Sequence, residues 1–110
     1  MPLYLLIKII GSLLDNAVEA VAEREQKDIF LLLTETEQDI ELVISNPFEF
    51  VPQTVFHDWL TEGHSTKGEM RGFGLPNVVK LSAEYDFIVK LYNKDTPDGN
   101  RIEVVVNIQK

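Results

Sequence analysis

The chain has 110 residues, enough for one domain with a hydrophobic core but short for two ordinary domains. Its apolar fraction of 45% is typical of a globular protein, and its net charge of −8 argues against nucleic acid or an anionic membrane surface as a partner. The absence of cysteine excludes disulfides and thiol chemistry, as fits a cytosolic protein. No repeat or low-complexity segment divides the sequence, so we expect a single domain over residues 1–110.

The start of the chain, from Leu3 to about Glu25, is predicted to form one long helix. Apolar residues recur there at helical spacing and define a wide buried face. Polar residues interrupt the segment too early for a membrane span, which needs about 20 apolar residues. At roughly 100° per residue these polar residues gather on the opposite side of the helix. They are Lys8, Ser12, Asp15, Asn16, Glu19 and Glu23.

Asn16 stands out within this polar face, because asparagine is a poor residue for a helix interior. Its amide competes for backbone hydrogen bonds, so its position between Leu-Leu-Asp and Ala-Val-Glu-Ala suggests a side chain kept for its oxygen. Oxygen ligands suit Mg²⁺, which makes Asn16 the candidate metal ligand. We interpret the outer members of the polar face as ordinary solvated surface.

Four strands are predicted from apolar alternation and from turn sequences. They cover Asp28–Thr36, Ile40–Asn46, Phe87–Asn93 and Arg101–Gln109. The first two are joined by a polar connection, and the last two by a Pro-Asp-Gly turn. The second strand is expected to stop at the Asn46-Pro47 step. At a strand end, Asn46 is either a ligand contact or a simple turn residue.

The segment from Phe48 to Glu62 is too apolar for a free loop. We expect Thr54–Leu60 to form a short helix that packs Val55, Phe56 and Trp59 against the edge of the domain. The segment as a whole is interpreted as a cover over the glycine-rich loop that follows it.

That loop runs from Gly63 into a predicted helix that begins at about Leu75. Pro76 suits the first turn of a helix, where its missing N–H leaves no hydrogen bond unmade. Free N–H groups and the positive end of the helix dipole favour an anion at such a position. Lys67 and Arg71 can add charge-assisted contacts to a phosphate.

Gly72 and Gly74 in the same loop permit close approach of the backbone to a ligand. The loop alone leaves two readings open, a phosphate-binding loop and an ordinary surface loop before a helix. The full order of elements is helix, strand, strand, covering segment, helix, strand, strand. It predicts an α+β two-layer sandwich with helices over one face of a mostly antiparallel sheet.

Two motifs in this order resemble the ATP-binding domain of histidine kinases. They are Leu14-Asp15-Asn16-Ala17-Val18-Glu19-Ala20 on the first helix, and Ser65-Thr66-Lys67-Gly68 with Arg71-Gly72-Phe73-Gly74-Leu75 after the first two strands. More widely, the chain is similar to the GHKL superfamily, shared with gyrase, the heat-shock chaperone and mismatch-repair ATPases. Its closest likeness is to quorum-sensing peptide-receptor kinases of the accessory-gene-regulator type.

The resemblance implies ATP and Mg²⁺ as ligands, with Asn16 holding the metal and no residue of this domain acting as nucleophile or base. Lys67 and the N–H groups at the start of the second long helix would face the phosphates, and Arg71 would reach the γ-phosphate. The residues implied around the nucleotide are Ser12, Asn16, Glu19, Asn46, Ser65, Thr66, Lys67, Arg71, Gly72, Gly74 and Leu75.

Two positions depart from the superfamily pattern. Adenine is usually recognised through an Asp in an Asp-x-Gly-x-Gly motif, where this chain has Asn46-Pro47-Phe48-Glu49-Phe50. Asn46 would then pair with adenine through its amide, and the missing glycines lead us to expect weak binding. Ser12 stands where many histidine kinases carry a second asparagine and the hydrolytic members carry a glutamate, so we expect no ATP hydrolysis.

The resemblance also implies partners. Neither His57 nor His64 is placed on a dimerisation helix, so the phosphorylated histidine would lie on a separate upstream domain of the same protein. The chain is then expected to be the C-terminal, cytoplasmic part of a membrane receptor, homodimeric at full length, that signals to a response regulator. The strand that the family usually has ahead of the asparagine helix is missing, so we expect residues 1–110 to be an N-terminally truncated fragment of the ATP-binding domain. Two alternatives are kept: a scaffold of the same fold that docks a signalling partner without binding nucleotide, and a gyrase-like ATPase.

Overall fold

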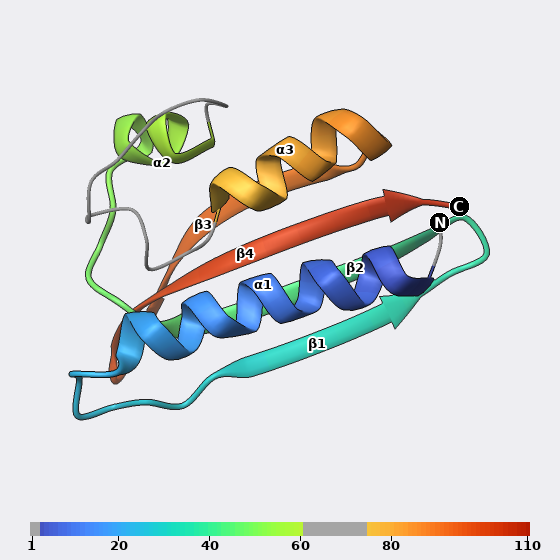
Figure 1. Ribbon diagram of the computed structural model, residues 1–110. Helices are drawn as coiled ribbons and strands as arrows, with labels where there is room; N and C mark the ends of the chain where they lie inside the picture. Colours follow the sequence, from blue (N-terminus) through green and yellow to red (C-terminus); the bar gives the residue numbers. More distant parts are fainter. Residues whose placement is uncertain (1–2, 61–74) are drawn as a thin grey trace.

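The computed structural model describes residues 3–60 and 75–110. The elements in chain order are helix α1 (Leu3–Val21), strands β1 (Phe30–Glu35) and β2 (Asp39–Pro47), helices α2 (Gln53–Leu60) and α3 (Leu75–Tyr85), and strands β3 (Ile88–Thr96) and β4 (Gly99–Gln109). All of these helices lie over one face of the sheet (Figure 1). The predicted α+β sandwich is therefore confirmed, as is the order of its elements.

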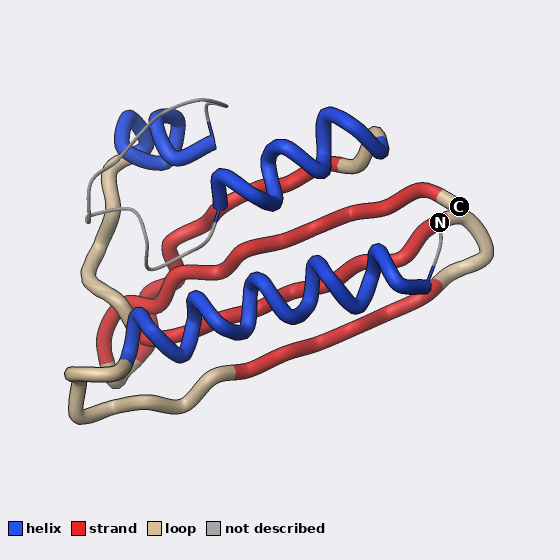
Figure 2. The backbone as a smooth tube through the Cα atoms, in the orientation of Figure 1, coloured by secondary structure: helices blue, strands red, loops and turns tan. Residues whose placement is uncertain are grey.

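The sheet has the strand order β1-β2-β4-β3, and every neighbouring pair is antiparallel. Each of the two predicted hairpins forms, and the pairing of β2 with β4 joins them, with Leu42 opposite Val106 and Ile44 opposite Val104. The two hairpins thus lie side by side behind α1 and α3 (Figure 2). Strands β1 and β3 are left at the two edges of the sheet.

The core lies between the sheet and the helices. On α1 the buried residues recur at intervals of four, which places them on one face of the helix. On β2 and β4 they alternate, which places them on the helix-facing side of the sheet. The members are Leu5, Ile9, Leu13, Ala17, Leu42, Ile44, Ile102, Val104, Val106 and Ile108, joined by Val78 of α3, by Phe56 and Trp59 of α2, and by Val51, Phe87 and Leu91.

The ends of several elements differ from the prediction. Helix α1 ends at Val21, so the expected end near Glu25 is wrong, and a turn follows in which the Arg24 N–H donates to the Val21 carbonyl. Strand β2 continues through Pro47, which pairs with Arg101 as its last residue. A proline is tolerated there because the end of a strand requires no further N–H from it.

Strand β3 continues to Thr96 instead of ending at Asn93. The turn into β4 is therefore tighter than expected, with Thr96 paired directly to Gly99. Gly99 has φ of 120°, a conformation that glycine adopts without strain. Along the described ranges, no helix has both the length and the apolar character needed to cross a membrane.

The predicted short helix before the glycine-rich loop is confirmed as α2. Phe56 and Trp59 are buried and meet edge to face, with ring centroids 5.7 Å apart. The expectation that this segment covers the loop cannot be compared with the fold, since residues 61–74 lie outside the described ranges.

Candidate functional site

Helices α1 and α3 lie side by side and run in opposite directions (Figure 1). At one end Tyr4, near the start of α1, is hydrogen-bonded to Tyr85, the last residue of α3. This bond raises the pKa of the Tyr85 phenol above its ordinary value, because the protonated hydroxyl takes part in it. The contact joins the start of α1 to the end of α3 at the surface of the molecule, since both tyrosines are exposed.

A hollow of about 380 Å³ opens between the two helices next to this pair. Ser12 lines it from α1, and its other walls are Lys8, Lys80, Leu81 and Glu84. Two lysines thus face the hollow in a chain whose net charge is −8. The sequence prediction named Ser12 but missed Lys80, because a lysine on a helix surface carries no local sign of what it faces.

Asn16 lies one helical turn beyond Ser12 on the same flank of α1. Because the helices are antiparallel, this turn lies alongside the first half of α3. The Asn16 side chain is half-buried, and its Nδ2 donates to the Ser12 backbone carbonyl at 2.5 Å. The amide is thereby oriented with Oδ1 as its remaining acceptor.

The donor chemistry at Asn16 fits Mg²⁺, which takes neutral carbonyl oxygens among its ligands. Nowhere within residues 3–60 and 75–110 do three His, Asp or Glu side chains come together as a metal-binding group. A single amide oxygen therefore suits a metal that also coordinates the oxygens of a bound phosphate, as Mg²⁺ does in nucleotide sites.

The first turn of α3 is the other half of the predicted site. Leu75 is the first residue of this eleven-residue helix, so its opening N–H groups have no partner within the helix. These donors and the positive end of the dipole favour an anion beside the Asn16 flank of α1. Ser65, Thr66, Lys67, Arg71, Gly72 and Gly74 lie outside the described residues, so their roles stay predictions.

Glu19 is exposed, one turn beyond Asn16 on α1, and its predicted supporting role stays a prediction. Asn46 lies within β2, so it is a strand residue and not a turn residue. Its side chain is only 1% exposed, and its Nδ2 donates to the Pro47 carbonyl at 2.9 Å. At this exposure the Asn46 side chain presents almost no surface to a ligand, so its predicted contact with adenine stays a prediction.

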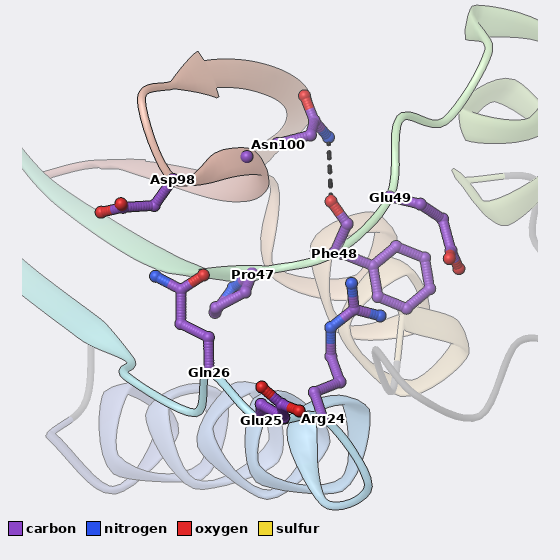
Figure 3. Close-up of a pocket in the computed structure, with 9 residues that line it drawn as sticks. Arg24, Glu25, Gln26, Pro47, Phe48, Glu49, Asp98 and Asn100 are labelled. Carbon is purple, nitrogen blue, oxygen red and sulfur yellow. Dashed lines mark hydrogen bonds between the residues drawn. The ribbon is translucent and has the colours of Figure 1, made fainter.

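A second hollow, of about 340 Å³, lies where β2 ends, beside the turn between β3 and β4 (Figure 3). The Arg24 guanidinium packs 5.4 Å from the centre of the Phe48 ring. Phe48 also exchanges backbone and side-chain hydrogen bonds with Asn100, at 3.1 and 3.2 Å. These contacts fix the chain as it leaves β2. The hollow shares no lining residue with the one between α1 and α3.

Asn93 of β3 holds the segment between β2 and α2 in place at Val51. Its Oδ1 accepts from the Val51 N–H at 2.9 Å, and its Nδ2 donates to the Val51 carbonyl at 2.7 Å. The Asn93 side chain thus makes the two hydrogen bonds that a neighbouring strand would make with the Val51 backbone, although the two residues are 42 positions apart. Sequence reasoning missed Asn93, because such a contact leaves no pattern in either segment.

Comparison with known proteins shows the family and the fold of the chain. The family model described as the GHKL domain matches residues 1–108, so the chain belongs to the GHKL domain family. The resemblance to this superfamily expected from the sequence is therefore confirmed. The chain is similar to the sensor protein CitS of Bacillus subtilis (strain 168), with 38% identity over 91 residues that make up 83% of this chain and 17% of CitS.

CitS of Halalkalibacterium halodurans is 35% identical over 83 residues, covering 73% of this chain and 15% of that protein. The chain thus spans about a sixth of the length of these relatives. Among solved structures, the nucleotide-free catalytic domain of the histidine kinase ThkA superposes with a TM-score of 0.60 at 15% identity. The superposition covers 94% of this chain and 65% of that domain, and it shows that the two share a fold.

Proposed function

We propose that this chain is the ATP-binding domain of a two-component sensor histidine kinase. In this role it holds Mg-ATP for phosphoryl transfer to a histidine on a separate domain of the same protein. The carrying observation is the position of Asn16, whose oriented amide oxygen lies on the flank of α1 that runs beside the start of α3. Helix α1 offers a metal ligand, and the start of α3 offers N–H groups that can bind phosphate.

Each described residue then has a defined task. Asn16 contributes Oδ1 to the metal, and the first turn of α3 donates N–H groups to the phosphates. Asn46 would pair with adenine only after its amide becomes accessible, since the side chain is 1% exposed, and Glu19 extends the polar flank. Bound Mg²⁺ would supply neutralisation of phosphate charge, which together with positioning is the main requirement of phosphoryl transfer.

Ser12 supports the kinase role over that of an ATPase. Hydrolysis needs a general base within hydrogen-bond reach of the attacking water. Ser12 lines the hollow between α1 and α3 at the position where we expect hydrolytic relatives to carry a glutamate. A serine hydroxyl cannot take that proton at neutral pH. We therefore propose that the domain holds and orients ATP, and that the nucleophile is an imidazole from another domain.

The likeness to two proteins named as sensors supports the wider assignment. We propose that the intact protein is a membrane-bound receptor with this domain in the cytoplasm, and that it works as a homodimer. Its partners would be a histidine-bearing dimerisation domain and a response regulator. That the receptor belongs to the quorum-sensing subgroup stays a prediction from the sequence.

Calorimetry with Mg-ADP tests the assignment directly. Asn16→Ala removes the amide oxygen from a half-buried position outside the apolar core, so the fold should survive. We expect its affinity for Mg-ADP to fall at least about tenfold, the scale on which losing a metal-site residue weakens binding. Asp15→Ala is the matched control, since Asp15 is the exposed neighbour on the same turn.

Affinity for Mg-ADP should be nearly unchanged in the Asp15 variant. Circular dichroism and thermal unfolding would establish that both variants fold. Equal binding by Asn16→Ala and the parent chain would remove Asn16 from the site. Absence of any nucleotide binding by the folded parent chain would contradict the proposal and favour a scaffold of the same fold.

A further inference from the structure

Residues 48–51 connect β2 to α2 and belong to neither a helix nor a strand. We call them the β2–α2 segment. The segment leaves the sheet where β2 ends at Pro47, on the side where the turn between β3 and β4 lies (Figure 1). Because the segment lies beyond the paired part of β2, its backbone N–H and C=O groups need other hydrogen-bond partners.

Two asparagines of the β3–β4 hairpin supply these partners. Asn100 is bonded to Phe48, the first residue of the segment, and Asn93 is bonded to Val51, the last. Nδ2 of Asn100 also donates to Oδ1 of Asn93 at 3.1 Å, so the two side chains form one network. The segment is thus held first by β4 and then by β3.

Asn93 is unexpected at its position in the sheet. Its register partner on β4 is Ile102, a core residue that is 0% exposed, and Val89 and Leu91 precede it on the same side of β3. Strands favour β-branched and aromatic residues in such a row, and a half-buried amide must be hydrogen-bonded. The two bonds to Val51 explain why an asparagine can stand there.

The same cross-strand row contains Asn46. Ile102 pairs with Asn46 on one side and with Asn93 on the other, so all three side chains point to the helix side of the sheet. Neighbouring strands are about 4.8 Å apart, which separates Asn46 from Asn93 by roughly 10 Å. The β2–α2 segment begins two residues after Asn46 and ends at Asn93, so it crosses the end of this row.

Both ends of the segment also meet a helix. The Arg24 guanidinium, just beyond the end of α1, packs against the Phe48 ring. Val51 is 4% exposed and belongs to the same core cluster as Phe56 of α2. The segment therefore closes the space between α1 and the sheet at the end where Asn46 lies.

We propose that Asn93 and Asn100 are positioning residues of the nucleotide site. They hold the β2–α2 segment in one place and so set the position of the wall beside Asn46, where the base of the nucleotide is predicted to bind. This inference rests on the proposed function, because it assigns both asparagines to the base end of that site.

The network should act on the base and not on the phosphates. Its hydrogen bonds run among β3, β4 and the β2–α2 segment, whereas Asn16 and the first turn of α3 are the predicted contacts of the metal and the phosphates. Loss of the network should therefore weaken the binding of Mg-ADP and leave the binding of Mg-tripolyphosphate, which has no base, unchanged.

NMR titrations of the 110-residue chain with these two ligands test the proposal, since they measure dissociation constants into the millimolar range. Asn93→Val removes both bonds to Val51 and places a favourable strand residue in the row. Its dissociation constant for Mg-ADP should rise at least about fivefold, or ~1 kcal/mol. Its dissociation constant for Mg-tripolyphosphate should equal that of the parent chain.

Asn107→Val is the matched control. Asn107 is also a strand asparagine, and its Nδ2 donates to Asp39 Oδ2 at 3.3 Å, but it lies on the outer face near the opposite end of the sheet. This variant should leave both dissociation constants unchanged.

Asn100→Ala covers a failure of Asn93→Val to fold. It removes the side-chain bonds to Phe48 and Asn93 but keeps the backbone bond from the Phe48 N–H to the Asn100 carbonyl. We expect the same selective loss of Mg-ADP binding, smaller than in Asn93→Val.

Hydrogen exchange of the Val51 N–H checks the network without any nucleotide. Oδ1 of Asn93 accepts from this group, so the group should exchange slowly in the parent chain and faster in Asn93→Val. Its exchange in Asn107→Val should match the parent chain. Equally slow exchange in Asn93→Val would mean that Asn93 does not hold the segment, and would overturn the proposal.

The titrations separate failure of this inference from failure of the proposed function. If the parent chain binds Mg-ADP and Asn93→Val binds it equally well, or if Asn93→Val loses both ligands to the same extent, the positioning role is wrong. A parent chain that binds Mg-tripolyphosphate as tightly as Mg-ADP would have no base end to position. A folded parent chain that binds neither ligand would contradict the proposed function itself, and this role with it.

Discussion

The two flanks of α1 differ in what they offer. The flank that carries Ser12 and Asn16 is polar, faces α3 across a hollow, and has its asparagine amide held in one orientation. The flank that carries Leu3, Ile7 and Val18 is apolar and exposed, and it lies beside a strand that is exposed as well. A row of buried side chains on α1 lies between the two flanks and holds both in position. We call this row the shared ridge: Leu5, Ile9, Leu13, Ala17 and Val21.

The difference separates a flank that suits a small ligand from a flank that suits apolar packing. A flank with oriented oxygens and nearby N–H donors suits a small, charged ligand, because few precise contacts hold it. A flank of exposed aliphatic side chains suits packing against a large apolar surface, because only a large area removes it from water. Changes on one flank should therefore leave the other intact, while changes in the shared ridge should affect both.

The largest effect is expected in the shared ridge. Ile9 is 0% exposed and packs between α1 and the sheet. Ile9→Ala removes buried methyl groups and leaves a cavity, so the free energy of unfolding should fall by about 2–5 kcal/mol. Urea denaturation measures this loss. Val18→Ala, a truncation on the exposed flank, should change the free energy of unfolding by less than about 0.5 kcal/mol.

If Ile9→Ala proved as mild as Val18→Ala, α1 would not be anchored by this ridge. The two flanks would then have no common support, and the comparison between them would lose its basis.

A smaller effect is expected from the Tyr4–Tyr85 pair, which touches only the α3 side. Hydrogen bonding to Tyr4 raises the folded-state pKa of Tyr85 above its unfolded value. The folded chain then holds this proton more tightly, so stability is full below about pH 10 and falls as pH rises through the raised pKa. Tyr85→Phe should reduce the loss of stability between pH 9 and pH 11, as followed by thermal unfolding.

Equal losses of stability between pH 9 and pH 11 in Tyr85→Phe and in the parent chain would mean that the contact with Tyr4 does not stabilise the protonated phenol of Tyr85.

The sequence was sufficient to predict the order of elements, because the apolar periodicity of α1 and the alternation along β2 reflect directly which sides are buried. The end of α1 was misplaced because Ala22, Glu23 and Arg24 are all acceptable helix residues, and the chain instead turns back after Val21. The exposure of β1 was not foreseen. A run of leucines has the same composition in a central strand as in an edge strand, and only the strand order distinguishes them.

The site was predicted where a single residue conflicted with its local structure. Asn16 is out of place in a helix interior, and that conflict is visible in the sequence. Asn93 and Arg101 were missed because the contacts that give them a role are made with distant parts of the chain. Their partners, Val51 and Asp28, are 42 and 73 positions away, so no local pattern connects them.

The most direct test of the assignment is a titration of the ¹⁵N-labelled chain with Mg-ADP, followed by NMR. The largest shifts are expected at the side-chain amide of Asn16 and at the backbone N–H groups of Asn77 and Val78 in the first turn of α3. The amides from Phe30 to Glu35 should move little. Shifts that gather around Phe48 and Asn100 or along β1, with Asn16 unmoved, would contradict a nucleotide site between α1 and α3.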